Sequence, residues 1–127
     1  MANGTIAFDT LSTSGQISGT AKSLDTDFVV NGSAKAVLSA DSDAVVSESF
    51  NIGSGTDHGS GDFSYTVTNA FTNTNYIFTA TAKSTQIRIT IQNEARDTAS
   101  VLGVLTRTDA GSTSNTNHNI AVHGDLA

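Results

Sequence analysis

The chain of 127 residues contains no cysteine, no proline and no tryptophan. Without cysteine it has no disulfide framework, no thiolate metal site and no thiol nucleophile. Without proline, exposed strand edges must be protected by charge, by bulges or by burial against other subunits. Without tryptophan, the usual platform for stacking a sugar ring is reduced to Tyr65 and Tyr76, and we expect both tyrosines to lie in the core.

Positive charge is also scarce. Six lysines and arginines are scattered among twelve acidic residues, and the net charge is −6. Because binding to DNA or RNA requires a cluster of basic side chains, we expect no nucleic-acid partner. No stretch approaches the roughly 18 apolar residues of a membrane span, and residues 1–10 lack the basic and apolar regions of a signal peptide. We therefore expect no membrane insertion and no leader.

What the chain does contain is a set of short alternating segments. Apolar residues alternate with polar ones at positions 63–67 and again at 76–80, and these two segments with Phe71 hold most of the aromatic residues. Alternation with a period of two predicts strands with one buried and one solvated face. We expect this central pair of strands to form the core of the fold.

Similar segments predict further strands elsewhere in the chain. They lie at residues 5–9, 34–40, 44–52, 86–92, 101–107 and 119–124. With turn residues between them and no credible helix, the pattern predicts an all-β fold, a compact antiparallel β-sandwich or barrel of about eight strands. In residues 86–92 we expect Ile87, Ile89 and Ile91 to point inward, and Glu48 predicts an edge or partly wet position for its strand.

The connections between these strands carry their own predictions. Asn31-Gly32 predicts a type I′ hairpin between residues 27–30 and the strand at 34–40, because both residues tolerate positive φ. Residues 53–62 and 109–117 are rich in glycine, serine and other polar residues, and we expect them to be loops. Residues 1–27 are expected to form an N-terminal arm, and residues 28–127 the β-sandwich domain.

Residues 11–24 are poor in apolar side chains and rich in serine, threonine and glycine. Alone, such a segment is poorly ordered. Two interpretations remain open, a linker and an arm that becomes ordered against a neighbouring subunit.

Histidines and acidic pairs are the first candidates for chemistry. His118 and His123 are five residues apart, so on one strand they face opposite sides of the sheet and do not close on one metal ion. Asp25/Asp27 and Asp41/Asp43 are Asp-x-Asp pairs of the kind that bind hard cations, but neither continues into a calcium loop. We expect structural histidines and turn-capping aspartates, and leave cation binding by either pair open.

Catalytic motifs are equally weak. Residues 53–59 contain Gly-x-Gly, but no helix and no lysine follow at the spacing of a phosphate loop. There is no Gly-x-Ser-x-Gly elbow for a serine nucleophile, and nothing in the sequence brings Glu48 and Glu94 together around a glycosidic bond. We therefore expect a protein that is not an enzyme, with no catalytic, cofactor-binding or metal-binding residues and no cofactor.

Several segments taken in order resemble a family of short tail-fibre-like virion proteins of tailed bacteriophages, many of them from marine and cyanobacterial hosts. The matching segments are GTIAFDT at 4–10, VVNGSAKA at 29–36, SFNI at 49–52, TDHGSGDFSYTV at 56–67, NY at 75–76 and VHGDLA at 122–127. The residue after the Ala-Lys-Ala triplet, aromatic in that family, is Val37 here. Binding specificity is therefore not carried over.

The resemblance implies a non-enzymatic structural protein on the surface of a virus particle, made in the host cytoplasm. It implies assembly as a homotrimer with other virion proteins of the capsid or the tail, as a capsid-decoration protein or a tail-fibre appendage. The alternative is a carbohydrate-binding module that recognises host surface glycans through the loops at residues 53–62 and 109–117.

Overall fold

The computed structural model describes residues 16–18, 23–84 and 88–127. The chain divides into two compact units, residues 1–32 and residues 33–127. The boundary therefore follows residue 32, whereas the sequence placed it after residue 27. In the described part of the chain, no helix is long and apolar enough to cross a membrane.

The described residues of the first unit form three short elements. Strands β1 (Gln16–Ser18) and β2 (Ser23–Asp25) pair antiparallel, and helix α1 (Thr26–Gly32) follows directly. The strand expected at residues 5–9 lies outside the described residues.

The predicted Asn-Gly hairpin is wrong. Residues 26–32 are helical, and neither residue 31 nor residue 32 has the positive φ that a type I′ turn requires. The strand that was expected to return from this turn, β3 (Ala36–Ala40), is paired on both sides, with β4 and β10. Because both edges of β3 are occupied, no edge remains for residues 27–30.

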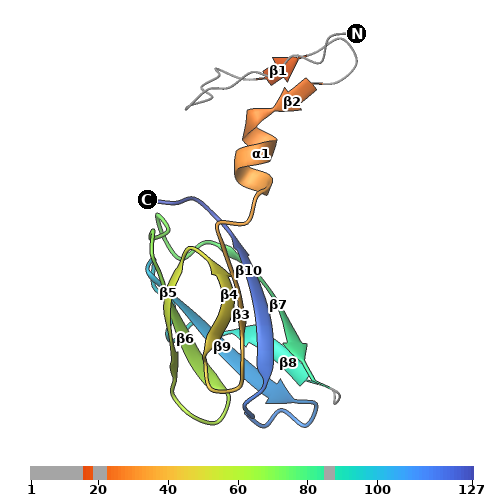
Figure 1. Ribbon diagram of the computed structural model, residues 1–127, viewed down its shortest axis with the longest axis vertical. Coiled ribbons are helices and arrows are strands. Elements are labelled where there is room, and N and C mark those ends of the chain that lie inside the picture. Colours follow the sequence, from red (N-terminus) through yellow and green to blue (C-terminus); the bar gives the residue numbers. More distant parts are fainter. Residues whose placement is uncertain (1–15, 19–22, 85–87) are drawn as a thin grey trace. The chain divides into compact units, whose positions relative to one another are not determined.

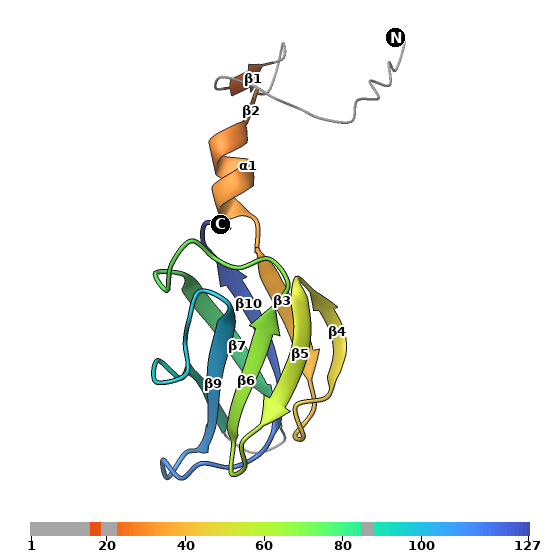
Figure 2. The same cartoon turned by 90° about the vertical axis from the view of Figure 1, so that its left-hand side faces the viewer.

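The second unit consists of two four-stranded antiparallel sheets (Figures 1 and 2). One sheet has the order β4-β3-β10-β7, and the other has the order β5-β6-β9-β8. The remaining bounds are β4 (Val46–Phe50), β5 (Ile52–Asp57), β6 (Asp62–Val67), β7 (Ile77–Lys83), β8 (Arg88–Gln92), β9 (Val101–Thr108) and β10 (Asn117–His123). The prediction of an all-β antiparallel fold is confirmed.

The core lies between the two sheets and follows the predicted alternation. Phe63, Tyr65 and Val67 of β6 are buried, as are Ile120 and Val122 of β10. The central strands at 62–67 and 77–83 are not paired with each other, however, because β6 belongs to one sheet and β7 to the other. Their inward side chains pack across the interior of the sandwich.

The segment expected as one strand at residues 44–52 is two strands in different sheets. The chain crosses from β4 to β5 at Asn51, whose φ is 60°. The Asn51 side chain donates to the carbonyl oxygens of Lys35 (2.9 Å) and Asn69 (3.0 Å) and accepts from the Asn69 amide (2.7 Å). Asparagine tolerates this conformation better than most residues, and its amide group fastens the corner.

A bulge changes the face on which side chains of β4 lie. The register shifts between Ser39 and Ala40, where Ala40 pairs with Val46 and Ser39 pairs with Glu48. Val46 therefore packs on the core while Phe50 is exposed, although strict alternation would place two residues four positions apart on one face. The prediction of an edge position for Glu48 is confirmed, because β4 is an outer strand of its sheet.

Residues 53–57 are part of β5 and not the predicted loop. A side chain at Gly55 would place its Cβ 2.2 Å from the Ala44 carbonyl oxygen and 2.8 Å from the Tyr65 ring. Glycine at this position is therefore required by the close approach of the turn before β4, rather than by flexibility.

One further prediction concerns the second half of the chain. The strand expected at 86–92 is described from Arg88 to Gln92, but the inward placement of Ile87, Ile89 and Ile91 lies outside the described side chains. Residues 93–100 form turns, and β9 passes through Gly103 without interruption.

Candidate functional site

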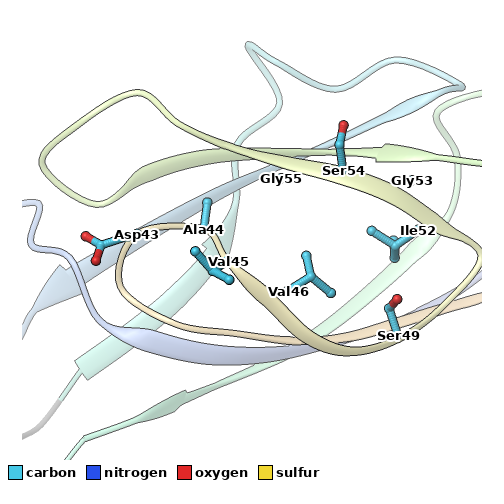
Figure 3. Close-up of a pocket in the computed structure, with 9 residues that line it drawn as sticks. All are labelled: Asp43, Ala44, Val45, Val46, Ser49, Ile52, Gly53, Ser54 and Gly55. Carbon is cyan, nitrogen blue, oxygen red and sulfur yellow. The ribbon is translucent and has the colours of Figure 1, made fainter.

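A slot of about 450 Å³ opens between β4 and β5, the neighbouring outer strands of the two sheets (Figure 3). Figure 3 shows Val46, Ser49 and Ile52 directed into the space between the two strands. The slot exists because the chain turns from one sheet to the other at Asn51, so that β4 and β5 diverge from a common corner. Its lining mixes apolar side chains with polar ones, and residues 53 and 55, both glycines, line it without side chains.

The polar groups of the slot are hydroxyls and one carboxylate. Ser49 lines it from β4, Ser54 lines it from β5, and Asp43 stands at one end. The Ser54 hydroxyl is 2.8 Å from that of Thr66, so it is already engaged within the sheet. In the described residues no base is hydrogen-bonded to the hydroxyl of Ser49 or Ser54, so the slot holds no activated nucleophile.

The loops at one end of the sandwich form a second polar region, which we call the loop end and define as residues 41–45, 58–61 and 109–116. The Asn115 side chain connects two of these loops, because its Oδ1 accepts from the Gly61 amide and its Nδ2 donates to Asp57 Oδ2 (3.3 Å). Gly61 has a φ of 76°, and a Cβ there would lie 2.7 Å from the backbone of Ser114. The two loops expected from the sequence are therefore in direct contact.

His58 lies in this end of the molecule. Its Nε2 is 2.9 Å from the Ser64 hydroxyl, and Asp57 Oδ1 accepts from the Gly59 amide (2.7 Å). A serine and a histidine thus meet on the exposed surface, but in the described residues the Asp57 carboxylate binds backbone and Asn115 rather than the imidazole. Without a carboxylate that orients the base, the pair lacks the third member of a hydrolytic triad.

His118 and His123 lie on opposite faces of β10, as their spacing predicts. His118 is fully buried, its Nδ1 lies 2.8 Å from the Thr116 carbonyl oxygen and its Nε2 lies 2.7 Å from Tyr65 Oη. Since a carbonyl oxygen only accepts, Nδ1 carries the proton and Tyr65 donates to Nε2. Burial lowers the pKa of His118 and raises that of Tyr65, so both groups are neutral at pH 7 and the pair joins the two sheets.

An ion pair lies on the outer side of the sheet β5-β6-β9-β8. Arg96 Nε donates to Asp62 Oδ1 (2.7 Å), and Asn93 Nδ2 donates to the same oxygen (3.0 Å). Hydrogen bonding from Arg96 lowers the pKa of Asp62, against the opposing effect of burial. Nearby, Asp97 accepts from the Gly103 amide (2.6 Å). These contacts fasten the segment before β9 to the sheet and engage the carboxylates of Asp62 and Asp97.

Of the two acidic pairs, the structure describes the side chains of Asp41 and Asp43. Asp41 Oδ1 accepts from the backbone amides of Asp43 and Val45, both at 2.9 Å, so Asp41 caps its turn as the sequence predicted. The side chains of Asp25 and Asp27 lie outside the described residues. In the described part of the chain, no three histidine, cysteine, aspartate or glutamate side chains gather in a way that could hold a metal ion.

The comparisons add no relative: no family model matches the chain, and neither a curated protein nor a solved structure resembles it significantly. The site must therefore be judged from its own geometry. The slot and the loop end offer hydroxyl, amide and carboxylate groups that are suited to binding. The contact of Asn115 with Gly61 and Asp57 escaped sequence reasoning, since no local pattern connects residues 54 or 58 positions apart.

Proposed function

We propose that this chain is a non-enzymatic structural protein of a tailed-phage virion, assembled on the capsid or the tail as a decoration protein or an appendage. The observation that carries the proposal is that the two ends of the sandwich differ. The chain enters at residues 33–35, where the Lys35 amide donates to the Val122 carbonyl oxygen (2.7 Å). The loop end lies at the opposite end of the strands (Figure 2).

Such an arrangement suits a module that is held at one end and displays loops at the other. A preceding segment of 32 residues is then available for attachment to capsid, tail or sister subunits. The order of segments that resembles short tail-fibre-like virion proteins supports the same assignment, and so do surface loops built from serine, asparagine, aspartate and glycine. Assembly as a homotrimer belongs to this proposal.

Quantitative mass spectrometry of purified phage particles tests the proposal. Peptides of the chain should be present at a fixed ratio to the major capsid protein, and the ratio should survive gradient purification. Particles without the chain, from a phage that encodes it, would overturn the assignment.

A carbohydrate-binding module is the second candidate, and one observation favours it. Asn115 joins the loops 58–61 and 109–116 into a single polar surface with His58 and Asp57, and hydroxyl, amide and carboxylate groups of this kind hydrogen-bond sugar hydroxyls. Host surface polysaccharides immobilised on an array provide the test. The variant His58→Ala should weaken binding, whereas the control His123→Ala, on a sheet face away from these loops, should not.

A further inference from the structure

Strands β4 and β5, which border the slot, each have an edge that no described strand occupies. Strand β4 pairs with β3 and β5 pairs with β6, and each lies at the end of its sheet. An unpaired edge presents backbone N–H and C=O groups that bond another extended segment, and proteins commonly protect such edges with lysine or proline. Neither strand contains a lysine, an arginine or a proline. The slot is therefore bounded by two edges that remain able to pair.

The backbone groups that β5 directs away from its own sheet are those of a glycine. The His58 amide donates to the Asp62 carbonyl oxygen (2.8 Å), and in an antiparallel pair every second residue bonds the partner strand. Thr56 and Ser54 therefore direct their backbone groups toward β6. Gly55 lies between them and directs its N–H and C=O groups toward the free edge.

Gly53 is not explained by the packing of the isolated sandwich. The register with β6 passes from Ile52 to Ser54, so Gly53 is left without a partner there. A Cβ at this position would lie 3.1 Å from the Thr66 hydroxyl, its nearest neighbour, and a small shift of that side chain would accommodate it. Glycine inside a strand often marks a place where another backbone approaches closely. The missing side chain therefore fits an occupant that is itself a strand.

The lining of the slot determines which side chains an added strand must carry. Val46 and Ile52 enter the slot and also pack against the core (Figure 3). Since successive side chains of a strand point to opposite sides, every second side chain of the added strand meets these two residues and must be apolar. Asp43 lies at one end of the slot, and β5 ends with Asp57 near the same turn. A further negative charge is unfavourable at that end.

Residues 5–9 of the chain have the pattern that the slot requires. They lie outside the described residues and read Thr-Ile-Ala-Phe-Asp. In an extended conformation Ile6 and Phe8 share one face, and Ala7 lies on the other. The segment has five residues, as β4 does. Its length and its alternation therefore match a strand that fills the slot.

We propose that residues 5–9 of a second copy of this chain add to the free edge of β5, with Ile6 and Phe8 in the slot against Val46 and Ile52. The proposal rests on the proposed function in so far as that function treats the chain as an assembling subunit. Each copy both gives and receives a strand, which closes a two-fold pair or a ring. One segment then covers both the free backbone edge and the apolar part of the lining.

Charge determines the direction of the added strand. Asp9 is the one charged side chain of the segment. Asp43 and Asp57 repel it from their end of the slot, so Asp9 is placed at the other end, beside the corner at Asn51. Strand β5 runs away from this corner, and the added strand therefore runs antiparallel to it. In an antiparallel pair one residue bonds its partner through both its N–H and its C=O, which suits Gly55.

Sedimentation velocity of the full chain, over a range of micromolar concentrations, tests the proposal. We expect an oligomer. Ile6→Asp combined with Phe8→Asp removes the apolar side chains of the added strand, and Ser49→Tyr places a bulky side chain in the slot. Each of these two variants should raise the dissociation constant about tenfold or more.

Each variant has a matched control. Leu11→Asp makes the same kind of change just outside residues 5–9. Ser47→Tyr lies on β4, but the Ser47 hydroxyl bonds the Ser39 carbonyl oxygen (3.1 Å) instead of lining the slot. Both controls should associate within about threefold of the wild type. Circular dichroism should show that all variants are folded, and the Ile6/Phe8 variant changes no residue of the sandwich.

A mixture of the two defective variants separates strand exchange from other kinds of contact. The Ser49→Tyr copy keeps its residues 5–9, and the Ile6→Asp/Phe8→Asp copy keeps its slot. Equal amounts should therefore form a mixed complex at a concentration where neither variant associates alone. Hydrogen exchange should also show amides of residues 53–55 that are protected in the wild type and exposed in the Ile6→Asp/Phe8→Asp variant.

Three results would overturn the inference. The first is a wild-type chain that stays monomeric at every concentration, and the second is an oligomer that Leu11→Asp weakens as much as the Ile6→Asp/Phe8→Asp change does. The third is a mixture of the two defective variants that forms no complex. None of these results bears on whether the chain is found in purified particles, so the strand exchange and the proposed function fail separately.

Discussion

The two sheets of the sandwich differ in how their outer sides are covered. On the sheet β5-β6-β9-β8, the segment before β9 is fastened by Arg96 and Asn93 to Asp62 and by Asp97 to the Gly103 amide. On the sheet β4-β3-β10-β7, the polar contacts of the described residues stay within the face, as in the bond from Lys83 to Ser39. One sheet is covered in part by its own chain, and the other is left as a broad exposed surface.

Because of this difference, side chains of one type contribute to different properties according to the sheet on which they lie. Residues of the covered sheet contribute to the stability of the single chain. Residues on the outer side of the sheet β4-β3-β10-β7 contribute little to that stability and become important only when something docks there. Measurements of unfolding and of association should therefore respond to different substitutions.

The largest expected difference is between two phenylalanines. Phe63 is fully buried on β6 and Phe50 is mostly exposed on β4. Phe63→Ala should lower the free energy of unfolding by about 3–5 kcal/mol, because it leaves a cavity in the core. Phe50→Ala should change it by less than about 0.5 kcal/mol. Urea denaturation at submicromolar concentration gives both values, and equal losses would contradict the contrast between the core and the exposed outer side of the sheet β4-β3-β10-β7.

The pair between the two sheets should have the next largest effect. His118→Phe removes the acceptor for the Tyr65 hydroxyl and the donor to Thr116, so that two buried polar groups lose their partner. We expect a loss of about 2 kcal/mol in the free energy of unfolding. His123→Phe, on the outward side of the same strand, is the control and should be nearly neutral. A neutral His118→Phe would mean that the buried pair contributes no net stability.

Acid should weaken the same pair in the wild-type chain. Burial lowers the pKa of His118 from its ordinary value of 6.5, so below about pH 6.5 the unfolded chain binds a proton that the folded chain excludes. The free energy of unfolding should therefore fall as the pH decreases from 7 to 5. Urea denaturation across this range should show a shallower pH dependence in His118→Phe, and an identical dependence would assign the effect to other groups.

The smallest expected effect concerns the segment before β9, which covers part of the sheet β5-β6-β9-β8. Asp97→Ala removes the acceptor for the Gly103 amide and for Gln92 Nε2. We expect a loss of about 1 kcal/mol, since these groups are only partly buried and water replaces part of the interaction. Asp43→Ala, at an exposed carboxylate in the turn before β4, serves as the control. Comparable stability of the two variants in urea would show that the covering segment is held by other contacts.

The sequence predicted strands well where a single rule decided the outcome. Alternation identified β6 and β10, because their inward residues all face one core. It failed at residues 44–52, where a bulge and the positive φ of Asn51 move the chain from one sheet to the other. The Asn-Gly turn signal failed at residues 27–32. It is a local signal, whereas distant strands occupy both edges of β3.

The candidate site shows the same limit. Composition correctly indicated polar loops, yet the slot between β4 and β5 depends on glycines that sequence reasoning assigned to a flexible connection. The junction of the two loops depends on Asn115, whose partners lie in a distant part of the chain. Contacts of this range follow from the topology of the sheets rather than from any local pattern.

The loop at residues 109–116 is held at its base and exposed at its tip. Thr106 Oγ1 donates to the Ser114 carbonyl oxygen (2.6 Å), and the side chain of the next residue, Asn115, accepts from the Gly61 amide. The tip at residues 109–113 is exposed, and only Gly111 there, with a φ of 83°, requires glycine. Substitutions at the other tip residues should therefore leave the fold intact. The protein can acquire a new recognition surface, by mutation or by engineering, without a new scaffold.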